Sequence, residues 1–85
     1  MNTAQLQDFV STVNTHVCES IDSQEYDRVF LDSLYECGIE EIELGKAFET
    51  DCGDWFWWVR ADERKAVLIQ YRSGRCAIVE RVHNV

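Results

Sequence analysis

The run Trp55-Phe56-Trp57-Trp58-Val59 constrains the fold most, because it places five consecutive large apolar residues in a short segment. Its aromatic and β-branched residues predict a strand over 55–61. Successive side chains of a strand point to opposite faces, so a sheet that is buried on one face should alternate apolar and polar residues. This run does not alternate. One layer of helices can cover one face only, and the other face should carry exposed rings.

A helix is predicted before this strand, over residues 3–20. Its apolar residues recur three and four positions apart, which places them along one side of a helix. Asn2 and Gln5 have the spacing of a capping box, in which each side chain accepts a hydrogen bond from the other residue's backbone N–H. The helix is therefore expected to begin close to residue 3.

A second helix is predicted over residues 23–37, with Asp22 and Glu25 as its capping box. Gly38 suits the left-handed position that ends a helix, and Ile39 falls where a Schellman motif packs an apolar residue back onto the last turn. Two short helices joined by a few residues should pack antiparallel. They are therefore expected to form one layer against the sheet.

The strand pattern before the aromatic run is less regular than the pattern after it. Residues 41–49 suit either a strand or a helical turn, and a hairpin that pairs 43–49 with 55–60 is the simpler interpretation. Two further strands are predicted over 66–72 and 75–82, from their β-branched and aromatic residues. Three or four strands are therefore expected.

The predicted fold class is α+β, with an N-terminal two-helix hairpin packed on one face of an antiparallel β-meander of three to four strands. A chain of 85 residues makes a single domain, 1–85. Within it, the helical hairpin is expected at 1–38 and the sheet at 41–83.

Ser73-Gly74 is a candidate two-residue hairpin loop between the last two strands. This loop would place Arg72 opposite Arg75, and like charges opposite each other should face water or an anion. The sheet face toward the helices is then predicted to hold Val67, Ile69, Tyr71, Cys76 and Ile78. The face away from the helices is predicted to hold Leu68, Gln70, Arg72, Arg75, Ala77, Val79 and Arg81.

The turn after the aromatic strand decides which rings point outward. A two-residue loop at Glu63-Arg64 would expose one alternating set of side chains: Trp55, Trp57 and Val59. A three-residue loop would expose the other set: Phe56, Trp58 and Arg60. Two alternatives would bury the rings in the core instead. The helix pair could straddle an edge of the sheet, or residues 83–85 could fold back over the outer face. Since Trp and Arg are enriched at binding hot spots, the predicted aromatic and basic interface is Trp55, Trp57, Trp58, Arg72 and Arg75.

Charge divides the chain at the same strand. Residues 1–54 hold thirteen of the sixteen acids and two of the eight bases, a net charge of −11, whereas residues 55–85 are at +3. A field this acidic favours a basic protein partner over anionic membranes or duplex DNA, which are polyanions. The alternative is that the charge serves only solubility. The predicted partner-binding carboxylates are Glu25, Asp32, Glu36, Glu40, Glu41 and Glu43.

No sequence pattern points to a catalytic, metal or cofactor site. The cysteines are at positions 18, 37, 52 and 76 without a C-x-x-C pair, and there is no glycine-rich phosphate loop. The chain is therefore expected to be a non-enzyme without cofactor or metal. No secretory signal is visible and the longest apolar run is too short to span a membrane, so a cytoplasmic protein with reduced thiols is expected.

The leading hypothesis is a non-catalytic acidic module that occupies a basic site on another protein, such as a site made for nucleic acid in an enzyme or complex. In size and acidity the chain is similar to small phage- or mobile-element-borne inhibitors and bacteriocin immunity proteins, a likeness of composition without a shared motif. A second hypothesis is a small homodimeric adaptor or assembly subunit that self-associates through the tryptophan-rich face. A third, which the acidic half disfavours, is a single-stranded nucleic-acid binder.

Overall fold

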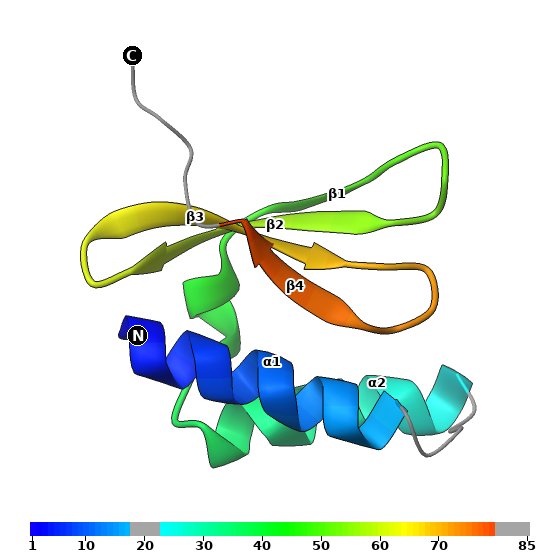
Figure 1. Cartoon of the computed structure of the whole chain (residues 1–85), viewed down its shortest axis with the longest axis horizontal. Helices are drawn as coiled ribbons and strands as arrows, with labels where there is room; N and C mark the ends of the chain where they lie inside the picture. Colours follow the sequence, from blue (N-terminus) through cyan, green and yellow to red (C-terminus); the bar gives the residue numbers. More distant parts are fainter. Residues whose placement is uncertain (18–22, 80–85) are drawn as a thin grey trace.

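Two helices are followed by four antiparallel strands, which confirms the predicted α+β class (Figure 1). The structure, a computed structural model, describes residues 1–17 and 23–79. Its elements are α1 (Thr3–Val17), α2 (Ser23–Glu36), the 3-10 helix η1 (Glu41–Leu44), β1 (Ala47–Glu49), β2 (Trp55–Ala61), β3 (Arg64–Gln70) and β4 (Cys76–Val79). The strands form one meander in the order β1-β2-β3-β4. Residues 18–20 of the first predicted helix, and Asp22 of the second capping box, lie outside the described residues.

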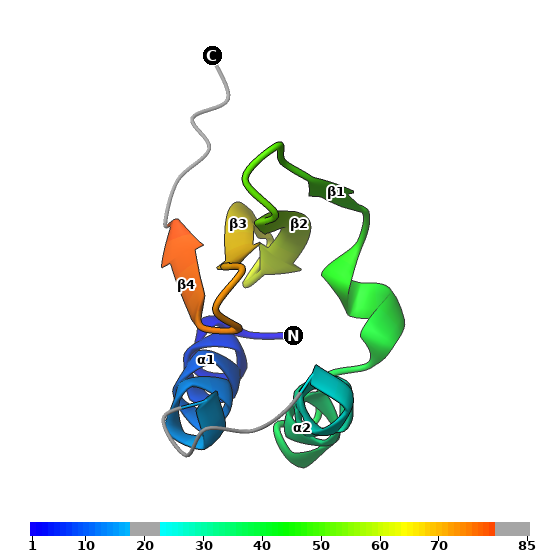
Figure 2. The ribbon, with the colours of Figure 1, turned by 90° about the vertical axis from the view of Figure 1, so that its right-hand side faces the viewer.

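The two helices lie side by side against one face of the sheet (Figures 1 and 2). The capping box predicted for α1 is confirmed, because the Asn2 N–H donates to Gln5 Oε1 at 2.7 Å and the Gln5 N–H donates to Asn2 Oδ1 at 2.8 Å. The Gln5 side chain also donates to the carbonyl of Cys37 at 3.1 Å. This bond ties the start of α1 to the end of α2, as the predicted antiparallel pairing requires.

The end of α2 has the predicted Schellman geometry. The Ile39 N–H donates to the Leu34 carbonyl at 2.9 Å, and the Gly38 N–H donates to the Tyr35 carbonyl at 3.1 Å. Gly38 has a φ of 71°, a left-handed conformation that glycine adopts without strain. Ile39 and Leu34 are both buried in the core, so the chain leaves α2 around an apolar contact.

The ambiguous segment before the aromatic strand divides into a helical turn and a strand. Residues 41–44 form η1, and residues 47–49 form β1. Between them Gly45 has a φ of 66°, and a Cβ at that position would clash with the carbonyl oxygen of Trp58. Glycine is therefore needed for η1 to approach β2 so closely. The predicted hairpin with the aromatic strand is confirmed for β1 only.

The loop between β3 and β4 is one residue longer than predicted. The Tyr71 N–H donates to the Arg75 carbonyl at 2.8 Å, so the loop consists of residues 72–74. Gly74 has a φ of 94°, the left-handed conformation that typically completes a three-residue hairpin loop. The prediction that Arg72 lies opposite Arg75 was therefore wrong, because the extra loop residue shifts the pairing of the two strands.

This shift exchanges the two faces of β3, since a slip of one residue moves every side chain to the other side. Leu68 pairs with Ile78 and is completely buried against the helices, where it was predicted to point away. Gln70 joins Leu68 on the inner face, whereas Val67 and Ile69 face away from the helices and Tyr71 is exposed. In β4, Cys76 and Ile78 face the helices and Ala77 faces away, as predicted. The side chain of Val79, and Arg81, lie outside the described residues.

The loop between β2 and β3 consists of Asp62 and Glu63, so it is neither the two-residue loop at Glu63-Arg64 nor the three-residue loop that were considered. Both residues have positive φ values, 51° and 63°, as in a type I′ turn. Glutamate seldom adopts this conformation, and a tertiary contact holds the loop: the Thr3 N–H donates to Asp62 Oδ2 at 2.9 Å. Because Trp57 pairs with Leu68, it faces the helices. The β2 side chains that face away are nevertheless those expected from the three-residue loop: Phe56, Trp58 and Arg60.

The core lies between the helix pair and the inner face of the sheet. Phe30 of α2 contacts Phe9 of α1 edge to face, with ring centroids 5.1 Å apart, and stacks on Trp57 of β2 at 6.0 Å. The buried apolar residues around these rings are Leu6, Val13, Leu34, Ile39, Leu44, Val59, Ala61, Ala66, Leu68 and Cys76. The alternative in which the helices straddle a sheet edge was therefore wrong, and residues 83–85 lie outside the described residues.

The register of β3 can be checked with two matched substitutions. Leu68→Ala should lower the free energy of unfolding by about 2–5 kcal/mol, because it removes a fully buried side chain. Ile69→Ala should cost about 1 kcal/mol, because Ile69 is half-buried on the open face. Urea unfolding followed by circular dichroism measures both. A larger cost for Ile69→Ala than for Leu68→Ala would contradict the observed register.

Candidate protein-binding surfaces

Three of the predicted carboxylates lie together on the exposed side of α2. Glu25, Asp32 and Glu36 are spaced seven and four residues apart, so they fall within about 40° of one another around the helix axis. This side of α2 is opposite Phe30, which faces the core. We call these three residues the acidic ridge.

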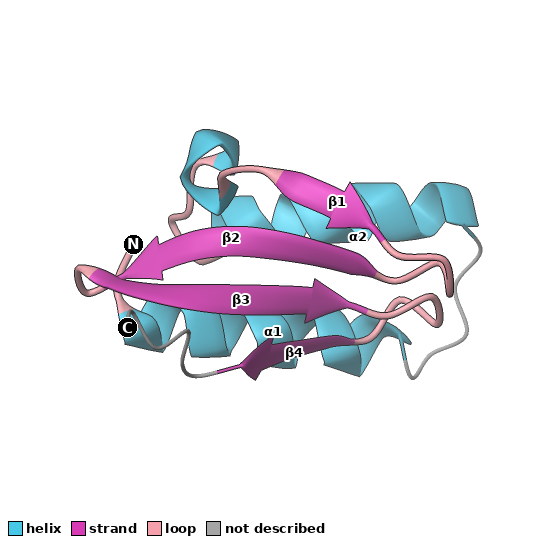
Figure 3. Ribbon diagram, turned by 90° about the horizontal axis from the view of Figure 1, so that it is seen from above, coloured by secondary structure: helices cyan, strands magenta, loops and turns pink. Residues whose placement is uncertain are grey.

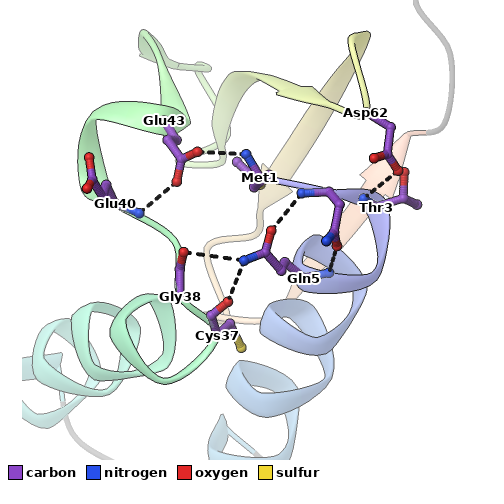
Figure 4. Close-up of polar contacts among 9 residues, drawn as sticks. Met1, Thr3, Gln5, Cys37, Gly38, Glu40, Glu43 and Asp62 are labelled. Carbon is purple, nitrogen blue, oxygen red and sulfur yellow. Dashed lines mark hydrogen bonds and ion pairs between the residues drawn. The ribbon is translucent and has the colours of Figure 1, made fainter.

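Glu40 and Glu41 continue the acidic surface beyond the end of α2, and both are exposed. Glu43 has a structural role instead. Its carboxylate accepts hydrogen bonds from the α-ammonium group of Met1 at 2.6 Å and from the Glu40 N–H at 2.8 Å (Figure 4). The bond from the ammonium group is the main reason that the pKa of Glu43 falls below its ordinary value. Glu43 therefore holds the N-terminus against η1.

The sheet face away from the helices carries a continuous apolar surface, which we call the outer sheet face. Its members are Phe48, Phe56, Trp58, Val67, Ile69 and Ala77. Phe48 is 46% exposed and Trp58 is 43% exposed. None of the described helices lies over this face (Figure 3). Arg60 pairs with Lys65 beside Trp58, so one end of the outer sheet face is basic.

The predicted aromatic and basic interface is divided among separate places. Trp58 lies on the outer sheet face, whereas Trp57 faces the helices. Trp55 lies on the same side as Trp57 and is 39% exposed. Arg72 is exposed in the β3–β4 loop and Arg75 is exposed directly after it, at one end of the sheet. The five residues therefore do not form a single patch.

Phe48 and Phe56 were not among the predicted interface residues, although their rings meet on the outer sheet face. The ring centroids lie 5.4 Å apart in an edge-to-face arrangement. Phe48 falls in the segment whose structure was ambiguous, and Phe56 points outward in only one of the two registers considered. The pairing of β1 with β2 was needed to bring the two rings together.

A chain of hydrogen bonds links the inner face of the sheet to α2. Trp57 Nε1–H donates to Gln70 Oε1 at 3.1 Å, Gln70 Nε2–H donates to the Tyr26 hydroxyl oxygen at 3.0 Å, and that hydroxyl donates to the Gly74 carbonyl at 2.7 Å. Burial raises the pKa of Tyr26 above its usual range, and burial raises the pKa of the Cys76 thiol to about 11. Both groups are protonated at neutral pH, so the cluster is suited to structure rather than to nucleophilic chemistry.

The cysteines should differ in their reactivity in the folded protein. Cys52 is exposed, whereas Cys76 is buried with a pKa raised from 9.0 to about 11, which lowers its thiolate fraction about 100-fold. Cys52 should therefore react with a thiol reagent at least about 100-fold faster than Cys76, and all four cysteines should react after unfolding. Time-resolved labelling with mass spectrometry measures both rates. Equal rates in the folded state, or stoichiometric zinc in the purified protein, would contradict this prediction.

Within residues 1–17 and 23–79, no three His, Cys, Asp or Glu side chains are placed to hold a metal ion. In the same part of the chain, no helix combines the length and the hydropathy needed to cross a bilayer. No protein-family model, curated protein or solved structure matches this chain. The functional interpretation therefore rests on the acidic ridge and the outer sheet face.

Proposed function

We propose that this chain is a non-catalytic protein-binding module whose acidic surface occupies a basic site on a partner protein. The observation that supports this most is the acidic ridge, which presents three carboxylates on one exposed side of α2. Glu40 and Glu41 extend the same surface, and the first 54 residues together carry a net charge of −11. A dense field of one sign on a rigid helix raises the rate at which an oppositely charged protein associates.

The partner we propose is a protein whose basic site is made for nucleic acid. Along α2 the ridge carboxylates are separated by about 6 Å and about 10 Å, since a helix rises about 1.5 Å per residue. Carboxylates on such a frame can take the place of phosphates against lysine and arginine side chains, with which both groups form charge-assisted hydrogen bonds. The resulting activity is that of an inhibitor or immunity-type protein, which blocks the site without performing chemistry.

The acidic ridge, together with Glu40 that continues its surface, can be tested by charge reversal with a matched control. The triple variant Asp32→Lys, Glu36→Lys and Glu40→Lys should lower the association rate about tenfold or more with the partner recovered from a host lysate. The control variant Asp8→Lys, Glu49→Lys and Asp51→Lys has the same net charge, but its changes lie on α1, β1 and the β1–β2 loop. Surface-binding kinetics across a salt series measures both variants. Equal effects of the two variants, or an association rate indifferent to salt, would mean that the acidity serves solubility only.

A second candidate function, a homodimeric adaptor or assembly subunit, is favoured by the outer sheet face. This face presents two exposed aromatic rings, Phe48 and Trp58, among half-buried apolar side chains. An exposed apolar patch of this kind marks an interaction site more often than chance exposure. A symmetric dimer would bury the same patch on both chains.

Self-association through this face predicts a sedimentation mass of about twice that of one chain at micromolar concentration. The double variant Phe48→Ser and Trp58→Ser should return a folded monomer, because it removes the two most exposed rings of the face. Tyr35→Ser is the control, since Tyr35 is 87% exposed but lies on α2. A wild-type chain that stays monomeric at hundreds of micromolar would exclude the dimer.

A further inference from the structure

A groove is lined by residues of α2, η1 and the inner face of β2 and β3. Its volume is about 480 Å³. Its apolar walls are formed by Phe30, Leu31, Leu44, Trp55 and Trp57. Phe30 and Leu44 are buried, whereas Leu31 is 48% exposed and Trp55 is 39% exposed. The groove is therefore an open extension of the core, with two large apolar side chains at its mouth.

The polar side chains of the groove are two carboxylates and one amide. Asp27 on α2 and Glu41 on η1 are both exposed, and no Lys or Arg side chain is among the described residues that line the groove. The amide of Gln70 is already engaged, because it accepts from Trp57 and donates to Tyr26. The two carboxylates are therefore the groups that an occupant of the groove would meet.

We propose that this groove binds an arginine side chain of the basic partner, an inference that rests on the proposed function and names its anchoring contact. The aliphatic stem of arginine can pack on the rings, its guanidinium plane can stack on an indole, and its five N–H donors suit carboxylates. A purely apolar occupant would remove the two carboxylates from water without a partner, which is costly. An anion would be repelled by the same carboxylates.

The groove and the acidic ridge would affect different steps of binding to a partner. Glu41 belongs to the acidic surface that follows α2 and also to the rim of the groove. Exposed charge acts mainly on the rate of association, whereas a side chain held in a ring-lined pocket acts mainly on the rate of dissociation. The ridge would therefore bring a basic surface close, and the groove would hold one of its arginines.

The three tryptophans allow the groove to be tested without the natural partner. Incorporation of 5-fluorotryptophan places one ¹⁹F label on each of Trp55, Trp57 and Trp58, and the three signals are assigned by replacing each tryptophan with phenylalanine in turn. Trp55 and Trp57 line the groove, whereas Trp58 lies on the outer sheet face. The probe is a blocked hexa-arginine peptide. Its control is the hexa-citrulline peptide, which keeps the shape of the side chain but lacks the charge.

The expected result is that hexa-arginine shifts the Trp55 and Trp57 signals and leaves the Trp58 signal in place, while hexa-citrulline shifts none of them. The double variant Asp27→Asn and Glu41→Gln should raise the dissociation constant of hexa-arginine about tenfold, because it removes both charges from the rim of the groove. The matched control, Asp32→Asn and Glu36→Gln, removes two charges from the acidic ridge. It should raise the dissociation constant of hexa-arginine less than about threefold.

Three outcomes would overturn the inference: a shift of Trp58 alone, equal shifts with hexa-citrulline, or equal weakening by the two double variants. These outcomes are independent of the proposed function, which is tested by charge reversal on the ridge. If the ridge variant slows association with the partner while Trp55 and Trp57 do not respond to hexa-arginine, the binding module stands and the groove is not its anchor. If the groove responds and the ridge variant has no effect, the groove site stands and the charge-steered module does not.

Discussion

The stack of Phe30 on Trp57 orients the whole sheet. Strand β2 carries rings on both of its faces, so its sequence does not say which face belongs against the helices. Phe30 lies between Phe9 of α1 and Trp57 of β2, and these contacts join both helices to the centre of the sheet. Once Trp57 faces inward, alternation along the strand sends Phe56 and Trp58 outward. The outer sheet face is a direct consequence of this choice.

The first residues of the chain hold several separate segments in place. Met1 binds Glu43 of η1, Thr3 binds Asp62 of the β2–β3 loop, and Gln5 binds the end of α2 (Figure 4). Further along α1, the Asn14 side-chain amide accepts from the Cys76 N–H at 2.8 Å and donates to the Cys76 carbonyl at 3.0 Å. Asn14 thereby takes the place of a neighbouring strand at the edge of β4, where an unpaired backbone would invite association.

Charge and apolar surface are separated in this molecule, and the separation shapes its proposed binding behaviour. The acidic ridge lies on the exposed side of α2, whereas Phe48 and Trp58 are exposed on the outer sheet face, which is turned away from α1 and α2. The basic partner that we propose would therefore meet the helical side, and self-association would use the outer sheet face. The groove between α2 and β2 is the place where apolar walls and carboxylates meet, so it combines the two kinds of contact.

Local signals in the sequence were enough to predict the two helices, the start of α1, the end of α2 and the α+β class. Capping at Asn2 and Gln5, and the helix end at Gly38, depend on neighbours a few residues apart, and both are found as predicted. The exposed carboxylates of α2 were also predictable, because helix periodicity alone places them on one side. What failed was the pairing of strands. The three-residue loop at 72–74 reversed the faces of β3, since a strand has a side-chain period of two.

Only the tertiary structure decided which rings are core and which are surface. The β2–β3 loop adopts a conformation that glutamate disfavours, and a hydrogen bond from Thr3, far away in sequence, supports it. Trp57 packs against the core because Phe30 of α2 stacks on it. Trp55 lines a groove because residues of α2 and η1 form the other walls. The sequence by itself determined the two helices, the strands from β2 onward and the charge, which depend on composition and local spacing. The sides of the sheet depend on packing between distant segments, which no local pattern encodes.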